Sequence, residues 1–190
     1  MKTIKAEMPP FSPRPIYSDL YPLDEFYAAR GQVLNVIDRI GPDKMPEPYC
    51  SLLVHKADMT STLEKFYGET LHVEVLQRHM RDNQYYRESA LVLDRTQRRV
   101  EFGAIKIILS LFPPEAQQEI LRGQQPLGRI LTLFEIPFTS RPVAWLRVMS
   151  DNYMNAALQL QGRQVLHGRR NALLDSWERP LAEIVEILPP

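Results

Sequence analysis

The chain has 190 residues and a mass of 22.1 kDa, and its 23 Lys plus Arg balance its 23 Asp plus Glu to give a formal net charge of zero. This balance excludes the strong positive field that proteins use to bind nucleic acids or anionic membranes. With 44% hydrophobic and 24% charged residues, the composition is that of an ordinary globular domain that needs neither metals nor disulfides to build its core.

Cys50 is the single cysteine, which excludes an internal disulfide and any thiolate-rich metal site. No stretch reaches the roughly 20 apolar residues of a spanning helix. The first five residues lead into prolines rather than into the apolar region of a signal peptide. We therefore expect a cytoplasmic protein that does not insert into membranes.

Prolines dominate the first 22 residues, where they alternate with Phe11, Tyr17 and Tyr21. Proline fixes its own φ and lacks the backbone N–H donor of a helix, so this segment cannot be a regular helix. We predict an extended arm, residues 1–22, whose aromatic side chains pack against a single domain formed by residues 23–190.

Helical signals follow the arm. Apolar residues recur at helical spacing from Leu23 to Ile40, and Gly41 with the proline after it supplies a stop. Asp58 can cap a second helix over residues 59–67, which Gly68 would end. Two helices are therefore predicted before the chain changes character.

Strand signals dominate the middle of the chain. Residues 71–80 favour a strand, and residues 84–93 and 100–111 are predicted to form a hairpin around a polar turn. Prolines at 114 and 126 open two short helices. Further strands are predicted over residues 142–148, 165–174 and 180–188.

Residues 151–162 fit either a strand extension or a short helix, so the sequence leaves that choice open. Elsewhere, successive strands follow one another without intervening helices, which indicates antiparallel pairing. We therefore predict an α+β fold with a single antiparallel β-sheet and helices packed against it.

Signatures of several enzyme classes are missing. There is no glycine-rich phosphate loop, no HExxH motif and no Gly-x-Ser-x-Gly elbow, and the four histidines lack metal-ligand spacing. We expect no metal and no cofactor, which leaves cofactor-free chemistry or none.

Two charged residues occupy apolar strands. Arg87 lies within the strand over residues 84–93, and Glu186 lies within the last predicted strand. A permanently charged guanidinium is costly to bury unless an anion meets it. Either both residues are structural charges, paired with each other or with neighbours, or they line a pocket for a small carboxylate.

Four fragments of the sequence resemble chorismate pyruvate-lyases, which convert chorismate to 4-hydroxybenzoate and pyruvate. The resemblance covers roughly residues 55–190 and implies the chorismate lyase-like fold and a cofactor-free lyase for quinone or secondary metabolism. The fragments are Asp58-Met59-Thr60, Tyr86-Arg87-Glu88, Pro126-Leu127-Gly128-Arg129, and Gly168-Arg169-Arg170 followed by a last strand that ends in Glu186-Ile187-Leu188-Pro189.

The resemblance also implies roles for individual residues. Arg87 would meet the ring carboxylate, Glu186 would meet the ring hydroxyl and assist proton removal, and Met59 and Leu127 would supply backbone and apolar contacts. Physical chemistry agrees, because an arginine fork fits a planar carboxylate, and Leu127-Gly128 at a helix start can present backbone N–H groups to an anion.

The sequence departs from the family in two places. Ala104 stands where members often have an arginine, and Lys106, on the same face of the strand, is the candidate substitute. The alignment of Glu186 needs a one-residue insertion before Pro180, so Glu183 is the alternative.

Two other functions remain open. One is a non-catalytic binding domain for a small aromatic carboxylate on the same fold, like the effector-sensing domains of some transcription regulators. The other is a lyase for a related enol ether. Residues 1–50 contain no basic helix-turn-helix pattern, and the sequence does not determine the oligomeric state.

Overall fold

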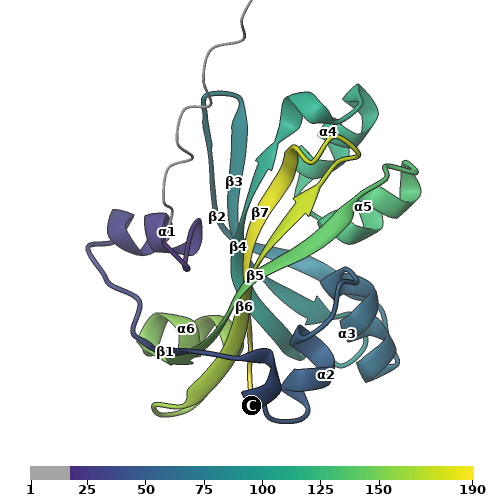
Figure 1. Ribbon diagram of the computed structural model, residues 1–190. Helices are drawn as coiled ribbons and strands as arrows, with labels where there is room; N and C mark the ends of the chain where they lie inside the picture. Colours follow the sequence, from purple (N-terminus) through teal and green to yellow (C-terminus); the bar gives the residue numbers. More distant parts are fainter. Residues whose placement is uncertain (1–17) are drawn as a thin grey trace, which may run out of the picture.

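The computed structural model describes residues 18–190, which form an α+β fold around one seven-stranded sheet (Figure 1). The strand order is β1-β5-β6-β7-β4-β3-β2, and every neighbouring pair is antiparallel. The predicted fold class is confirmed. The strands are β1 Val36–Ile40, β2 Leu71–Arg81, β3 Gln84–Leu93, β4 Arg99–Ile108, β5 Thr139–Met149, β6 Val165–Leu174 and β7 Pro180–Leu188.

Helices cover both faces of the sheet. Figure 1 shows α1 and α6 on one side of the sheet and α2, α3, α4 and α5 on the other. Each group buries its own apolar clusters against the strands. The helices are α1 Leu23–Ala29, α2 Tyr49–Leu53, α3 Met59–Tyr67, α4 Pro114–Arg122, α5 Leu127–Leu133 and α6 Asn152–Leu158, with short 3-10 turns at Pro42–Lys44 and Leu109–Leu111.

The predicted helix over residues 23–40 is wrong in its second half. Helix α1 ends at Ala29, and Gly31 adopts a left-handed φ of 68° that breaks the helix. Residues 36–40 instead form the edge strand β1, which pairs with β5 and alternates half-buried and exposed residues. Its β-branched residues favour a strand, and pairing with β5 outweighs the helical spacing.

Two short helices follow from local capping. Asp58 accepts a hydrogen bond from the backbone N–H of Ser61 at 2.9 Å, and Gly68 ends α3 with a φ of 67°, as predicted. The segment that the sequence left open forms helix α6, because Asp151 caps it by accepting from the N–H of Met154 at 2.7 Å.

The hairpin of β3 and β4 is confirmed, although β4 ends at Ile108, earlier than predicted. Its register sets Arg87 opposite Ile105 and Leu91 opposite Glu101, while β7 sets Glu186 opposite Gly103. Since side chains alternate along a strand, Arg87, Glu101 and Glu186 project from the same face of the sheet. This is the face that α3 and α5 cover.

Residues 1–17 of the predicted arm lie outside the described residues. Tyr21, near its end, is 3% exposed, and its hydroxyl lies 3.0 Å from that of Tyr86. The boundary between arm and domain stays a prediction. In the part of the chain that the structure describes, none of the helices has the length and apolar character needed to cross a bilayer.

Candidate functional site

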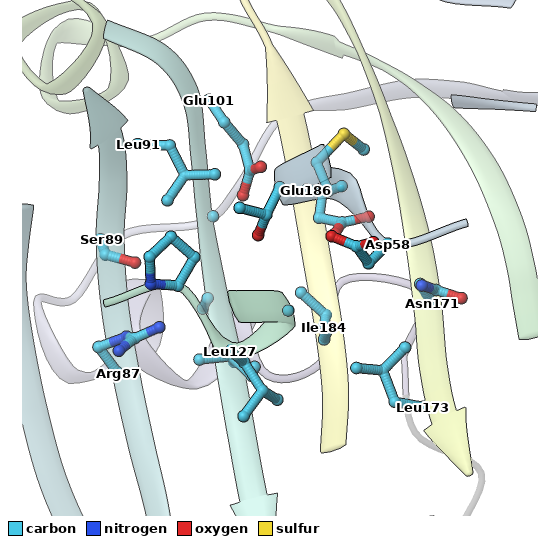
Figure 2. Close-up of a pocket in the computed structure, with 17 residues that line it drawn as sticks. Asp58, Arg87, Ser89, Leu91, Glu101, Leu127, Asn171, Leu173, Ile184 and Glu186 are labelled. Carbon is cyan, nitrogen blue, oxygen red and sulfur yellow. The ribbon is translucent and has the colours of Figure 1, made fainter. Parts of the chain in front are cut away.

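A small cavity lies between the sheet and the first turns of α3 and α5 (Figure 2). Its volume is about 60 Å³, enough for a few water molecules. The five residues predicted for the site all line it: Met59 from α3, Leu127 and Gly128 from α5, Arg87 from β3 and Glu186 from β7. The structure thus brings together residues that are far apart in the sequence.

The strand register sets the length of this cavity. Arg87 and Leu91 are four residues apart on β3, a span of about 13 Å at about 3.3 Å per residue. Glu101 lies opposite Leu91, and Glu186 lies level with the intermediate pair Ser89 and Gly103. Figure 2 accordingly shows the two glutamates away from Arg87 along the strands. The cavity therefore has a cationic end and an end with two carboxyl groups.

Arg87 supplies the cationic end. It is only 4% exposed, and its Nε has no hydrogen-bond partner in the described part of the chain. Within residues 18–190 its guanidinium has no ion-pair partner either. Burial lowers the pKa of this guanidinium, while the nearby Tyr85 and Glu101 oppose the shift. An arginine in this condition provides an unmatched buried positive charge.

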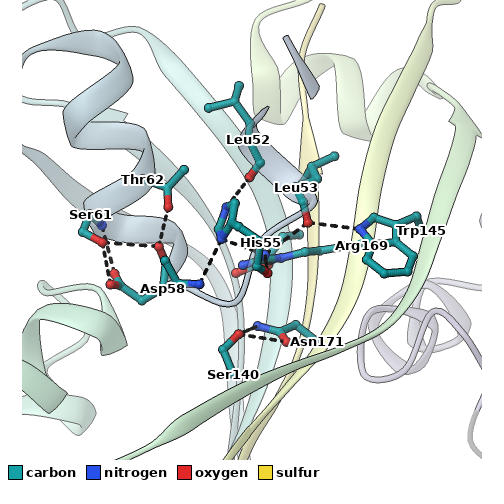
Figure 3. Close-up of polar contacts among 12 residues, drawn as sticks. Leu52, Leu53, His55, Asp58, Ser61, Thr62, Ser140, Trp145, Arg169 and Asn171 are labelled. Atoms are coloured by element: carbon teal, nitrogen blue, oxygen red, sulfur yellow. Dashed lines mark hydrogen bonds and ion pairs between the residues drawn. The ribbon is translucent and has the colours of Figure 1, made fainter. Parts of the chain in front are cut away.

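Glu186 already has a cationic partner. Its carboxylate accepts a hydrogen bond and forms an ion pair with Arg169, which is 0% exposed. Arg169 Nη1 also donates to the carbonyl oxygens of Leu53 and His55, at 3.3 Å each (Figure 3). Glu186 is therefore tied, through Arg169, to the segment that joins α2 to α3.

Glu101 is a site residue that the sequence analysis missed. It is 9% exposed and lines the cavity, and its Oε2 has no hydrogen-bond partner among the residues that the structure describes. Burial raises its pKa well above the ordinary value and the charge of Glu186 raises it further, while Arg169 and Arg87 act in the opposite direction. The signal that could have found it is an acidic residue within the apolar run of β4.

Gly128 allows the two covering helices to approach closely. A Cβ at this position would lie 2.5 Å from Asp58 Oδ1 and 3.0 Å from Thr60 Oγ1. Any larger residue at the start of α5 would therefore push it away from the capped start of α3. This contact closes one wall of the cavity.

The suggestion that Lys106 replaces the missing family arginine is wrong. Lys106 and Ala104 do share a face, but that face is opposite to the one on which Glu101 and Ile105 lie, and it is the α1 side of the sheet. There Lys106 Nζ lies 3.0 Å from Glu183, and 5.4 Å from the ring centre of Tyr21. The same contact removes Glu183 as the alternative to Glu186.

Across residues 18–190, no three His, Cys, Asp or Glu side chains are grouped so that they could hold a metal ion. His72, for example, is paired with Asp94 at 2.6 Å, and His167 is stacked on Tyr49 with ring centres 4.4 Å apart.

Comparisons with known proteins address the fold. The sequence matches no family model and no curated protein. PhnF from Mycobacterium smegmatis superposes with a TM-score of 0.55 at 14% identity, over 72% of this chain and 65% of that one, less than two thirds of its length. The effector domain of PhnF from the same organism has the same TM-score and identity, over 70% of this chain and 88% of that domain. The chain has the chorismate lyase-like fold.

A third structure is the ligand-binding domain of a protein described as a GntR-family transcriptional regulator, from Bordetella bronchiseptica. It has a TM-score of 0.48 and 10% identity, over 63% of this chain and 85% of that one. At these identities the likeness is one of fold.

The prediction that this chain is a chorismate lyase is contradicted. The two structures with TM-scores of 0.55 are described as PhnF and as the effector domain of PhnF, and neither is described as a lyase. The geometry supplies a physical reason, because Glu186, expected to assist proton removal, is already held by Arg169. The prediction of chorismate chemistry for quinone biosynthesis loses its support with it.

Proposed function

We propose that this chain is a non-catalytic domain that binds a small aromatic carboxylate as an effector. One observation carries the proposal: Arg87 lies 4% exposed in the wall of a cavity with an unpartnered Nε. A buried unmatched guanidinium destabilises the protein unless a ligand neutralises it. The effector domain of PhnF, which shares the fold, supports a sensing role.

The chemistry of Arg87 selects the anionic group. A guanidinium presents a planar fork of N–H donors that matches a carboxylate in a bidentate arrangement. Binding would replace an unfavourable buried charge by a charge-assisted pair in a site largely shielded from water. A carboxylate is therefore the ligand group proposed for the Arg87 end.

The apolar lining of the cavity favours a ligand with a flat apolar ring. Aliphatic side chains supply much of the lining, with Ile105 and Ile184 level with Arg87 on the sheet and Leu127 on α5. Such walls with a few convergent polar groups are typical of small-molecule sites. The volume of about 60 Å³ is smaller than a cavity that holds a benzene ring, so binding of even a single ring would require α5 to move.

The remaining predicted residues take roles consistent with this ligand. Met59 and Leu127 would contact the ring, and Gly128 would keep α5 against α3 at the edge of the site. Glu186 would accept a hydrogen bond from a polar substituent at the far end of the ring. These assignments follow from position in the lining.

Calorimetric titration of the protein with benzoate and 4-hydroxybenzoate tests the proposal. Both should bind to the wild-type protein, and Arg87→Met should weaken binding by roughly 100-fold, the size expected for a lost charge-assisted pair. Arg122→Met is the matched control, because Arg122 is 61% exposed at the end of α4. Equal affinity in both variants would contradict the assignment of Arg87.

The absence of catalysis has a separate test. Chorismate incubated with the protein should be recovered in the amount found without protein. Release of 4-hydroxybenzoate and pyruvate, followed by chromatography, would overturn the non-catalytic assignment.

A further inference from the structure

Glu101 has no role in the binding scheme proposed for Arg87 and Glu186. Buried polar atoms in folded proteins are nearly always hydrogen-bonded, so each exception needs an explanation. In the described chain, Arg87 Nε, Arg169 Nη2 and Glu101 Oε2 are such exceptions, and all three residues lie at or directly behind the cavity. Arg87 has a proposed anionic ligand and Arg169 has Glu186, whereas Glu101 has neither.

The position of Glu101 limits what it can contact. It projects into the cavity from β4, two residues from Gly103, the residue that pairs with Glu186, and on the side away from Arg87. Figure 2 shows the two side chains at the same end, away from Arg87. A ligand whose carboxylate meets Arg87 would therefore present its opposite end to both glutamates.

The two carboxyl groups differ in their surroundings. Glu186 pairs with Arg169, whereas Glu101 faces Glu186 without a direct cationic partner among the described residues. Neighbouring buried carboxyl groups do not both ionise readily. Burial and the Glu186 charge both raise the pKa of Glu101, which favours its neutral form. A neutral carboxyl is a hydrogen-bond donor, and an ionised one is an acceptor only.

The other charged groups around this end are consistent with Glu101 as the donor and Glu186 as the acceptor. Arg87 comes from β3 and Arg169 from β6, and His55 lies beside Arg169 in the segment after α2. Asp58, which caps α3, has its carboxylate occupied by Ser61. The lining residues of α5 are Pro126, Leu127 and Gly128, none of which titrates. Among the charged residues that line the cavity, Glu101 and Glu186 are therefore the ones that face the far end of a ligand with free hydrogen-bonding capacity.

We propose that Glu101 is a specificity-determining residue that selects a ligand with a hydroxyl group opposite its carboxylate. Glu101 donates a hydrogen bond to the hydroxyl oxygen, and Glu186 accepts one from the hydroxyl proton. A hydroxyl can do both, whereas an aromatic amine donates but accepts poorly, and an unsubstituted ring does neither. The inference rests on the proposed function, because it assumes an aromatic carboxylate in the cavity.

The test compares 4-hydroxybenzoate, 4-aminobenzoate and benzoate on the wild-type protein, Glu101→Gln and Glu101→Leu, by calorimetry at neutral pH. The wild type should prefer the hydroxylated ligand over the other two by about 10-fold, the cost of leaving a buried donor unpaired. Glu101→Gln keeps an N–H donor and should retain this preference. Glu101→Leu should reduce the ratio to about one while benzoate binds as before.

The outcomes separate the two proposals. If the wild type binds benzoate and shows no preference for the hydroxyl, or if Glu101→Leu keeps the preference, the role of Glu101 is overturned and the carboxylate site stands. If no aromatic carboxylate binds to the wild type, both fail together. Should Glu101→Leu not fold, the wild-type ratios and Glu101→Gln still decide the matter.

Discussion

Arg87 and Glu88 are neighbours in the sequence and buried charges in the structure, yet they lie on opposite faces of β3 and in opposite conditions. The side chain of Glu88 is 0% exposed and accepts two hydrogen bonds from Arg30 at 2.8 Å each, with a third from Tyr153 at 2.8 Å. Arg87 lies beside a cavity, and its Nε has no partner within residues 18–190. Burial of a charge therefore does not by itself identify a candidate functional residue, and the missing partner is what distinguishes Arg87 from Glu88.

The helices explain this contrast. On the Glu88 face, α1 supplies Arg30 just past its end and α6 supplies Tyr153, and the Arg30 guanidinium lies 3.8 Å from the centre of the Tyr153 ring. Burial, followed by the hydrogen bond to Glu88, raises the pKa of Tyr153 to about 12, so its hydroxyl remains a donor. On the Arg87 face, the starts of α3 and α5 enclose a cavity and supply no carboxylate that pairs with Arg87.

Removing the partner of Glu88 should have the largest effect on stability. Arg30→Met would leave a buried carboxylate unpaired and should lower the free energy of unfolding by about 3–5 kcal/mol in urea titrations. Arg39→Met is the control, since Arg39 is 65% exposed and its ion pair with Asp19 should contribute less than about 1 kcal/mol. If both variants lose the same free energy of unfolding, the contacts of Glu88 with Arg30 and Tyr153 do not stabilise the fold.

A pH series should reveal the second carboxyl of the cavity. Folding raises the pKa of Glu101 above the ordinary value of 4.5, so the folded state binds the proton more tightly than the unfolded state. Proton binding by Glu101 therefore stabilises the folded state fully below pH 4.5, and this stabilisation is lost as the pH rises through the pKa of the folded state. The unfolding free energy of the wild type relative to Glu101→Gln should fall by at most about 1.4 kcal/mol per pH unit in that window. A difference that stays flat with pH would show that Glu101 titrates normally.

Arg87→Met should have the smallest effect on stability. The substitution removes a buried charge without breaking a pair, so the unfolding free energy should stay equal to that of the wild type or rise by about 1 kcal/mol. Urea unfolding without ligand measures this directly. A large loss of stability would place Arg87 with Glu88 as a structural charge and would end the contrast between the two faces.

Much of the site was visible in the sequence because the signals were local. Arg87 and Glu186 stood out as charges in apolar strands, and alternation along the strands placed them on one face once the pairing was known. Glu101 was missed because no local signal in the sequence shows whether its carboxyl group has a partner. An acidic residue in a strand looks alike in sequence whether or not a partner from another strand neutralises it.

The sequence by itself determined the elements that depend on neighbouring residues: the capped helix α3, the hairpin of β3 and β4, and the α+β class. Only the tertiary structure decided that residues 36–40 pair with β5 as a strand and that Lys106 points away from the cavity. It also decided that Arg169 pairs with Glu186, while Arg87 has no ion-pair partner within residues 18–190. Caps and turns are satisfied within a few residues, whereas the partner of a buried charge is fixed by strands that meet across the whole chain.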